Sequence, residues 1–323
     1  MAILATERVL THDYWKMAQD IQVGDVLFDR LGNPVTVKLV QKYRAQRCFE
    51  VEFSDKLTVA GDEHLKLPLE NEKYRNRANE YKGVFQFTRP LKPTPLGILI
   101  DTPLEGRPTR REYSVPTAKS LQLPAQDLPV PPFVFGFWFF NRSKYNQFKP
   151  ALQYAEFVIE KLKDAGYIPQ KGKVFDTKPT VLSHLVPNVP HKIPNNYLLA
   201  SAEQRFELLS GILHSKPNQY NAKTDTLRFT HKTKIIASQI QYLAESLGCK
   251  TRMTFDNTKR YYTVFIKTRL KLLQDQTPKP IKVRQAWRYV ADVYEIQPQS
   301  CVHIETDGQD NSFLVGEGFI PCL

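Results

Sequence analysis

Two stretches at opposite ends of the chain decide the fold: AILATERVLTHDYWKMAQDIQVGDVLFD at 2–29 and CVHIETDGQDNSFLVGEGFIP at 301–321. Both consist of short runs of β-branched and aromatic residues. Both also contain a Gly-Asp or Asp-Gly pair, which favours a tight turn between strands. The long segment between them has a different character. This pattern predicts one compact β unit assembled from both termini, with a second unit inserted between its halves.

The length and composition of the chain allow two such units. At 323 residues the chain is long enough for two domains that each bury a core. Its composition, 41% hydrophobic and 24% charged, is that of a globular protein and excludes a disordered or fibrous class. The net charge of +12 favours a polyanionic partner such as nucleic acid, although by itself it shows only non-specific attraction.

Cysteine spacing and hydropathy indicate the compartment. The four cysteines show no CxxC spacing, which argues against a metal framework and a disulfide scaffold: Cys48, Cys249, Cys301 and Cys322. We find no apolar signal core and no run of about 18 apolar residues that would span a bilayer. We therefore expect a soluble, intracellular protein in the cytoplasm with no membrane partner and no metal site.

The chain reads as four consecutive segments. Residues 1–70 and 285–323 have β character. Residues 71–115 form a basic, proline-rich linker that either contacts DNA or is simply a solvated connection. Residues 116–284 alternate helical and extended patterns. They read as two copies of a helix, strands and helix unit, a weak internal repeat of α+β type.

Four stretches carry a family resemblance. They are Trp15 followed by DIQVGDVLFDRLGNPVTV at 20–37, TVAGDEHLKL at 58–67, REYSVP at 111–116 and FLVGEGFIP at 313–321. In this order the two ends resemble the halves of a Hint (hedgehog/intein) domain, a horseshoe-like all-β fold. The middle resembles the LAGLIDADG homing endonuclease, an α+β domain of pseudo-twofold symmetry that many inteins carry. More narrowly, the chain is similar to inteins of phage terminase large subunits and replicative helicases.

The resemblance implies an autocatalytic protein-splicing element that needs no cofactor for splicing. Its first step requires a nucleophile at the first residue of the element, a position that falls on Ala2. The histidine that polarises the scissile amide matches His64. The proton carrier of the later steps matches His303, and Asn311 replaces a second family histidine.

The reactive groups of splicing are missing at both ends. Alanine carries no nucleophile, and the C-terminal stretch reads Pro321-Cys322-Leu323 without the family's His-Asn pair. The sequence therefore predicts a splicing-deficient chain, and Cys322 has no neighbour in sequence that would activate its thiol. Both an engineered replacement and natural decay fit this pattern.

The endonuclease motif also departs from the family. Gly136 and Gly211 match the glycines at which the two motif helices pack closely. The two metal-binding acids then fall on Asn141 and Lys216, and a lysine repels Mg²⁺. We therefore expect no cleavage. Mg²⁺ is a cofactor only if the domain is an active homing endonuclease, which is one alternative function.

A DNA-binding module without catalysis is the other alternative, and double-stranded DNA is then a partner. Basic residues of the middle segment would supply the contacts. The candidates are Lys144, Lys171, Lys173, Arg228, Lys232, Lys234, Arg252, Lys259, Arg260, Lys267 and Arg269. Lysines on any solvated surface give the same composition. The remaining expected partners are the flanking segments of a host protein, a terminase or helicase in a phage or bacterial cell, and the chain is expected to be a monomer.

Overall fold

The computed structural model describes residues 2–71, 92–95, 113–141, 147–148, 152–166, 175–176, 192–217, 219–276 and 287–323. Most of the predicted linker lies outside these residues, as do the candidate DNA contacts Lys144, Lys171 and Lys173. The chain divides into two compact units: unit 1 comprises Met1–Leu121 and Ile281–Leu323, and unit 2 comprises Gln122–Pro280. No helix in the described parts is long and apolar enough to cross a membrane.

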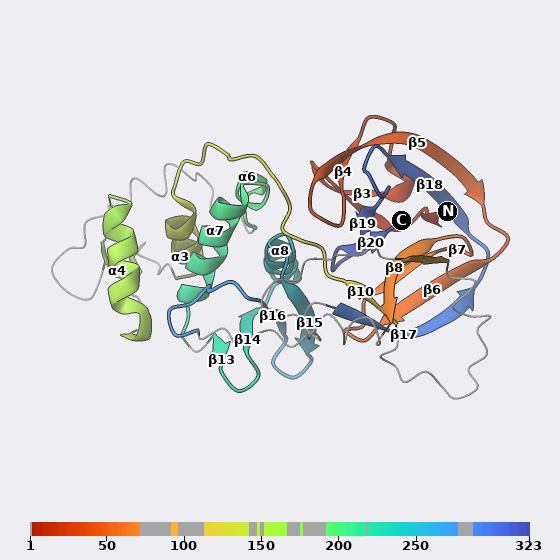
Figure 1. Ribbon diagram of the computed structural model, residues 1–323. Coiled ribbons are helices and arrows are strands. Elements are labelled where there is room, and N and C mark those ends of the chain that lie inside the picture. The colour runs from red at the N-terminus through yellow and green to blue at the C-terminus, as the bar shows by residue number, and fades with distance from the viewer. Residues whose placement is uncertain are drawn as a thin grey trace. The chain divides into compact units, whose positions relative to one another are not determined.

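Unit 1 is built from strands contributed by both ends of the chain (Figure 1). Its strands are β1 (Ile3–Leu4), β2 (Arg8–Thr11), β3 (Tyr14–Met17), β4 (Val26–Phe28), β5 (Pro34–Arg44), β6 (Cys48–Phe53), β7 (Thr58–Asp62), β8 (Lys66–Asn71), β9 (Lys92–Pro95), β10 (Tyr113–Pro116), β17 (Trp287–Ile296), β18 (Ser300–Thr306), β19 (Phe313–Val315) and β20 (Ile320–Cys322), with a 3-10 turn η1 (Ala18–Asp20).

The order of these strands interleaves the two ends. It runs β20-β19-β2-β4-β5-β18-β1-β7-β6-β17-β10-β8-β9, and β3 pairs with β2. β18 therefore lies between β5 and β1, and β19 pairs with β2. The two ends belong to one β unit, as their sequence predicts.

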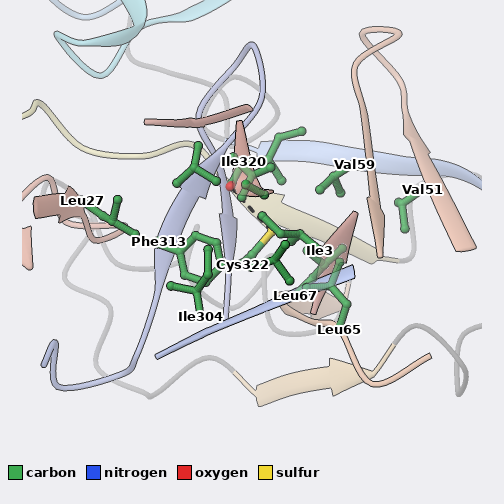
Figure 2. Packing of buried hydrophobic residues seen from close by; sticks show 14 of the residues in the cluster. Ile3, Leu27, Val51, Val59, Leu65, Leu67, Ile304, Phe313, Ile320 and Cys322 are labelled. Atoms are coloured by element: carbon green, nitrogen blue, oxygen red, sulfur yellow. Dashed lines mark hydrogen bonds between the residues drawn. The ribbon is translucent and has the colours of Figure 1, made fainter. Parts of the chain in front are cut away.

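The core of unit 1 draws on the same two ends (Figure 2). Alternating residues of β6 are fully buried, as a strand with one covered face requires. The buried cluster combines Ile3 and Val9 with Phe313 and Ile320, none more than 2% exposed. A fully buried aliphatic or aromatic side chain contributes about 1.5–3 kcal/mol. Contacts between the two ends therefore contribute directly to the core that stabilises this unit.

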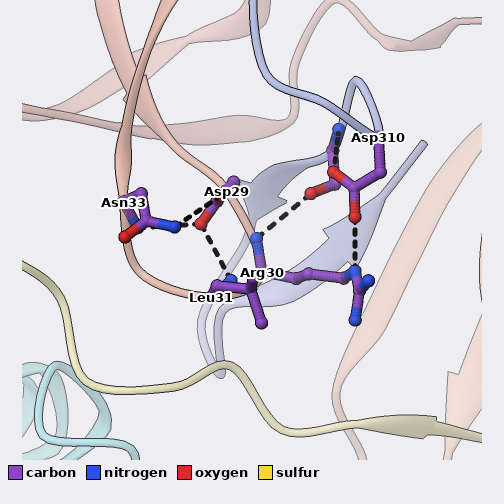
Figure 3. Close-up of polar contacts among 6 residues, drawn as sticks. Asp29, Arg30, Leu31, Asn33 and Asp310 are labelled. Atoms are coloured by element: carbon purple, nitrogen blue, oxygen red, sulfur yellow. Dashed lines mark hydrogen bonds and ion pairs between the residues drawn. The ribbon is translucent and has the colours of Figure 1, made fainter. Parts of the chain in front are cut away.

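Two loops also connect the ends (Figure 3). The Asp29 carboxylate accepts hydrogen bonds from the backbone N–H groups of Leu31 and Asn33, each at 2.8 Å, and closes the turn between β4 and β5. The Arg30 side chain forms an ion pair with Asp310, in the loop before β19. This pair joins positions that are 280 residues apart in sequence.

Unit 2 contains helices and smaller sheets. The helices are α3 (Pro132–Asn141), α4 (Ala155–Asp164), α6 (Asn195–Leu198), α7 (Ala202–His214) and α8 (Lys234–Glu245), with a 3-10 turn η2 (Leu152–Tyr154). The strands are β11 (Gln147–Phe148), β12 (Phe175–Asp176), β13 (Tyr220–Asn221), β14 (Thr226–His231), β15 (Lys250–Asp256) and β16 (Tyr261–Lys267). β13, β14, β16 and β15 form an antiparallel sheet in that order. The helices α7 and α8 and the strands β14, β15 and β16 follow the helical and extended patterns of the sequence, whereas the short strand β13 was not predicted.

Two glycines bring α3 and α7 into close contact. A Cβ on Gly136 would lie 2.5 Å from the carbonyl oxygen of Leu208, and one on Gly211 would lie 2.1 Å from that of Phe133. Each glycine thus faces the carbonyl three residues before the other glycine. This reciprocity is the relation expected of two helices around an approximate twofold axis. Any larger side chain at either position would force the helix backbones apart.

Candidate functional site

The short connection between β7 and β8 contacts residues from both ends of the chain. The N–H of Asp62, at the end of β7, donates to the carbonyl oxygen of Ala2 at 3.0 Å. The N–H of Leu323 donates to the carbonyl oxygen of Lys66, at the start of β8, at 2.9 Å. Ala2 and Leu323 are only 2% and 8% exposed, respectively. The β7–β8 connection therefore binds the backbones of residues 2 and 323 in a shielded environment.

The Asp62 side chain adds a second contact to Ala2. Its Oδ1 accepts a hydrogen bond from the Ala2 N–H at 2.9 Å, and its Oδ2 accepts one from the Tyr43 hydroxyl at 2.6 Å. Asp62 is itself 3% exposed. Burial is the main cause that raises the pKa of Tyr43, and the hydrogen bond to Asp62 raises it further. The phenol therefore stays protonated and acts as a donor. Both oxygens of the Asp62 carboxylate thus accept hydrogen bonds, and the donor to one of them is the peptide N–H of residue 2.

The Ala2 side chain lies in a small cluster of buried residues: Leu4, Ala45, Cys48, Ala60 and Cys301, with Ile296 packed against it. The sulfur atoms of Cys48 and Cys301 are 3.9 Å apart, and all four cysteines of the chain are free and buried. Burial, together with the neighbouring Cys48, raises the pKa of Cys301 to about 12. The Cys301 thiol therefore stays protonated at neutral pH.

The two histidines predicted for this site differ in exposure, with side chains 71% exposed at His64 and 14% exposed at His303. His64 lies in the connection between β7 and β8, and its Nε2 is 3.7 Å from the Glu63 carboxylate. His303 lies in β18, on the same face as Cys301, and its Nε2 is 2.9 Å from the Glu305 carboxylate. Continuing the β1–β18 register by one residue places His303 opposite Ala2. The roles of both histidines stay predictions. The side chain that forms a hydrogen bond with the Ala2 backbone is that of Asp62.

Asn311 performs a structural task. Its Oδ1 accepts a hydrogen bond from the Thr306 N–H at 2.6 Å, and its φ of +53° closes the turn after β18. Asparagine tolerates this left-handed backbone conformation better than most residues do. The residue that replaces the second family histidine thus shapes the loop that precedes β19.

A half-buried acid, Glu7, interacts with Cys322 of the C-terminal strand. Oε1 of Glu7 accepts a hydrogen bond from the Ala60 N–H at 2.8 Å. Burial raises the pKa of Glu7 to about 7, and the Glu50 carboxylate nearby adds to the rise. Burial also holds the pKa of the Cys322 thiol well above its usual range, with Glu7 as a further cause. Cys322 packs in the main core, where its side chain is shown in Figure 2.

In unit 2, the positions that match the endonuclease acids make structural hydrogen bonds. Nδ2 of Asn141, at the end of α3, donates to the carbonyl oxygen of Ser215 at 2.8 Å. Nζ of Lys216, just after α7, donates to the carbonyl oxygen of Thr230 at 3.1 Å and lies 4.8 Å from the Phe229 ring centre. Burial lowers the pKa of Lys216. In the described parts of the chain, no group of three or more histidine, cysteine or acidic residues could hold a metal ion.

One face of the four-stranded sheet in unit 2 is basic and exposed. The strand register places Arg228 of β14 and Arg252 of β15 on either side of Phe265 of β16. Both arginines are exposed, and the Arg252 guanidinium lies 5.3 Å from the Phe265 ring centre. Lys267 is on the same face, and Lys232 lies over the Tyr261 ring at 5.6 Å. The other described candidates, Lys234, Lys259, Arg260 and Arg269, are exposed as well.

Asp62, Tyr43 and Glu7 were missed by sequence reasoning. Asp62 lies only two residues before His64, in the stretch that carries the resemblance. The signal that could have found it is strand alternation, because an acid among the apolar residues of β7 must have a partner if it points inward. The partner itself comes from a strand pairing that local sequence does not reveal.

Comparison with known proteins gives limited similarity. No family model matches the chain. A curated relative, the replicative DNA helicase DnaB of Mycobacterium intracellulare, is 24% identical over 334 residues. That alignment covers 95% of this chain and 55% of the helicase, so the chain spans about half the length of the relative it matches.

Solved structures of inteins also show similarity. The MchDnaB-1 intein is 28% identical, with a TM-score of 0.20 over 21% of this chain and 53% of that chain. The gp41-1 intein is 22% identical, with a TM-score of 0.20 over 22% and 54%. The Msm DnaB1 intein splicing domain bound with zinc is 28% identical, with a TM-score of 0.20 over 21% and 55%. At this TM-score the likenesses carry no argument about the fold.

Proposed function

We propose that the chain is an intein-type protein-splicing element with a Hint fold, whose N-terminal junction lies at Ala2. Splicing joins the segment before the element to the segment after it, so the two junctions must lie close together. The observation that carries the proposal is the β7–β8 connection, which binds the backbone of Ala2 at one end and that of Leu323 at the other. The interleaved strands of unit 1 support it, because they bring the two ends into one core.

In this proposal the position of the first splicing nucleophile is occupied by Ala2, whose side chain offers no nucleophile. No cofactor is needed for the reaction. The host whose flanks would be joined is a replicative helicase or a terminase, and the alignment with a helicase supports the first of these.

Restoring the missing groups tests the proposal. The full chain is placed between two reporter proteins with Ala2→Cys, and a His-Asn-Cys sequence is added after Leu323. We expect a ligated product of the two reporters, detected by mass spectrometry. With Ala2→Cys alone we expect dithiothreitol to release the N-terminal reporter. The unchanged chain is the matched control and should release nothing, whereas failure of both restored forms would contradict the proposal.

We propose as a second function that unit 2 is a degenerate LAGLIDADG-type domain that binds duplex DNA without cleaving it. Two observations favour it: the reciprocal packing of Gly136 and Gly211, and the exposed row formed by Arg228, Phe265 and Arg252. A row of cations beside an aromatic ring suits contact with a phosphate backbone. Asn141 and Lys216 lack the charge to hold Mg²⁺, which argues against the active endonuclease.

A mobility shift assay with duplex DNA tests this second function. Binding should weaken by about 10³-fold or more between about 50 and 200 mM salt if six or more phosphates are contacted. Arg228→Glu and Arg252→Glu should each weaken binding, whereas Lys163→Glu, on the exposed side of α4, should change it little. Absence of a shift at low salt would contradict DNA binding. A double-strand break with Mg²⁺ would contradict the loss of cleavage.

A further inference from the structure

The contact between Asp62 and Ala2 is more than a strand-pairing contact. The β1–β7 ladder itself pairs Ile3 with Gly61, and the Asp62 N–H extends it to the Ala2 carbonyl oxygen. The carboxylate is an addition: its Oδ1 lies 2.9 Å from the Ala2 nitrogen. Asp62 therefore binds both backbone groups of residue 2, the N–H through its side chain and the C=O through its main chain.

This arrangement fixes an acid in a shielded place. Asp62 and Ala2 are 3% and 2% exposed. A buried carboxylate is costly unless hydrogen bonds satisfy it, so the Ala2 N–H and the Tyr43 hydroxyl are required partners. Because Tyr43 binds Oδ2 at 2.6 Å, the carboxylate is oriented with Oδ1 towards the Ala2 nitrogen.

We propose that Asp62 is the catalytic residue that acts on the peptide bond joining residue 1 to residue 2, and that Tyr43 is its positioning residue. This inference rests on the proposed splicing function. It assigns to Asp62 a task that the sequence resemblance assigns to His64, whose side chain is exposed in the β7–β8 connection.

The chemistry follows from the position of the carboxylate. When residue 2 carries a thiol, its sulfur attacks the carbonyl carbon of residue 1, a C–S bond forms and the C–N bond to residue 2 breaks. The nitrogen leaves as an amine that takes up the proton given up by the thiol and, at neutral pH, one more from water. Positive charge thus develops on the atom that Oδ1 of Asp62 already contacts. A fixed negative charge in a buried site stabilises the positive charge that develops on this nitrogen.

The test uses the full chain carrying Ala2→Cys, with a reporter fused ahead of residue 1, and measures the rate at which dithiothreitol releases the reporter. Asp62→Asn keeps the shape and removes the charge, and we expect it to slow release by about 100-fold. Asp29→Asn is the matched control. It alters another buried carboxylate that accepts backbone N–H groups in the same unit, and it should leave the rate within about twofold of its parent.

Tyr43→Phe provides a second variant that keeps the ring and removes only the hydroxyl. Release should slow by on the order of tenfold, since the carboxylate is less well oriented. In the Asp62→Asn background the same change should slow release no further, because the hydroxyl acts only through this carboxylate. A purely structural tyrosine would slow release equally in both backgrounds. If Asp62→Asn does not fold, Tyr43→Phe decides the question.

The outcomes separate the two proposals. If the Ala2→Cys parent releases no reporter, the splicing function is wrong. If the parent releases it and Asp62→Asn or Tyr43→Phe releases it at the same rate, the role of Asp62 is wrong and the splicing function stands. If His64→Ala loses release while Asp62→Asn releases the reporter normally, His64 and not Asp62 is the catalytic residue at this peptide bond.

Discussion

The two units differ in what now occupies the positions to which the resemblance assigns chemistry. In unit 1, Ala2 is held by its backbone alone, and its methyl group takes part in no polar contact. In unit 2, Asn141 and Lys216 each donate a hydrogen bond to a backbone carbonyl. The side chain of Ala2 is therefore free of hydrogen bonds, whereas those of Asn141 and Lys216 are each bound to the backbone. This difference predicts that chemistry is easier to restore in unit 1 than in unit 2.

The helix pair of unit 2 should show the largest effect of a single substitution. In Gly211→Ala, the new Cβ would meet the Phe133 carbonyl oxygen at 2.1 Å, and that atom belongs to a helix backbone. Alanine favours a helix over glycine by about 1 kcal/mol, but the clash should outweigh this gain. We expect a net loss of about 3 kcal/mol in the free energy of unfolding, measured by urea denaturation followed by circular dichroism at 222 nm.

Glu203→Ala serves as the control for this substitution. It lies on the exposed side of the same helix, α7, so its effect should stay within about 0.5 kcal/mol. If Gly211→Ala proves as mild as Glu203→Ala, the close contact of α3 with α7 is not what defines unit 2.

This helix pair also shows how far sequence can take the structure. The close packing at the two glycines could be predicted, because the resemblance matches them to the glycines at which two motif helices pack. The β unit could be predicted from its short runs and Gly-Asp turns. The contact of Asp62 with Ala2 could not, since it depends on the pairing of β1 with β7 across 60 residues. The tasks of Asn141 and Lys216 could not either, because they depend on carbonyl groups of neighbouring elements.

Asn141→Asp tests whether the site in unit 2 has become structural. The change removes the donor to the Ser215 carbonyl and places a negative charge 2.8 Å from that oxygen. We expect a loss of about 2 kcal/mol in the free energy of unfolding. Asn221→Asp is the matched control, because Oδ1 of Asn221 only accepts hydrogen bonds, from the N–H groups of Lys223 and Thr224, and an aspartate can do the same. Equal effects of the two substitutions would remove the contrast between the units.

Glu7 gives unit 1 a pH dependence that can be measured. Its pKa is about 7 in the folded chain and 4.5 in the reference state, so the folded state holds a proton that the unfolded state releases. The contribution of Glu7 to the free energy of unfolding is fully present below pH 4.5 and is lost as the pH rises through 7. Between pH 5 and pH 8 we expect the free energy of unfolding to fall by about 1 to 2 kcal/mol more in the native chain than in Glu7→Gln.

Urea midpoints at the two pH values measure this difference. Glu317→Gln is the control, since this carboxyl is 43% exposed in the same unit and its removal should leave the pH dependence in place. A Glu7→Gln chain with the full pH dependence of the native chain would show that another group is responsible.

The smallest expected effect concerns the loops that join the two ends of unit 1. Arg30→Gln removes the ion pair with Asp310 but keeps the hydrogen bond from the Arg30 N–H to the Ser312 hydroxyl at 3.1 Å. The Arg30 side chain is 18% exposed, so its ion pair is screened less than the pair of Arg8 with Glu317, in which both side chains are more than 40% exposed. We expect Arg30→Gln to cost up to about 1 kcal/mol in urea denaturation and Arg8→Gln close to zero. If Arg30→Gln and Arg8→Gln lower the free energy of unfolding equally, unit 1, unlike unit 2, is stabilised by strand pairing and its apolar core alone.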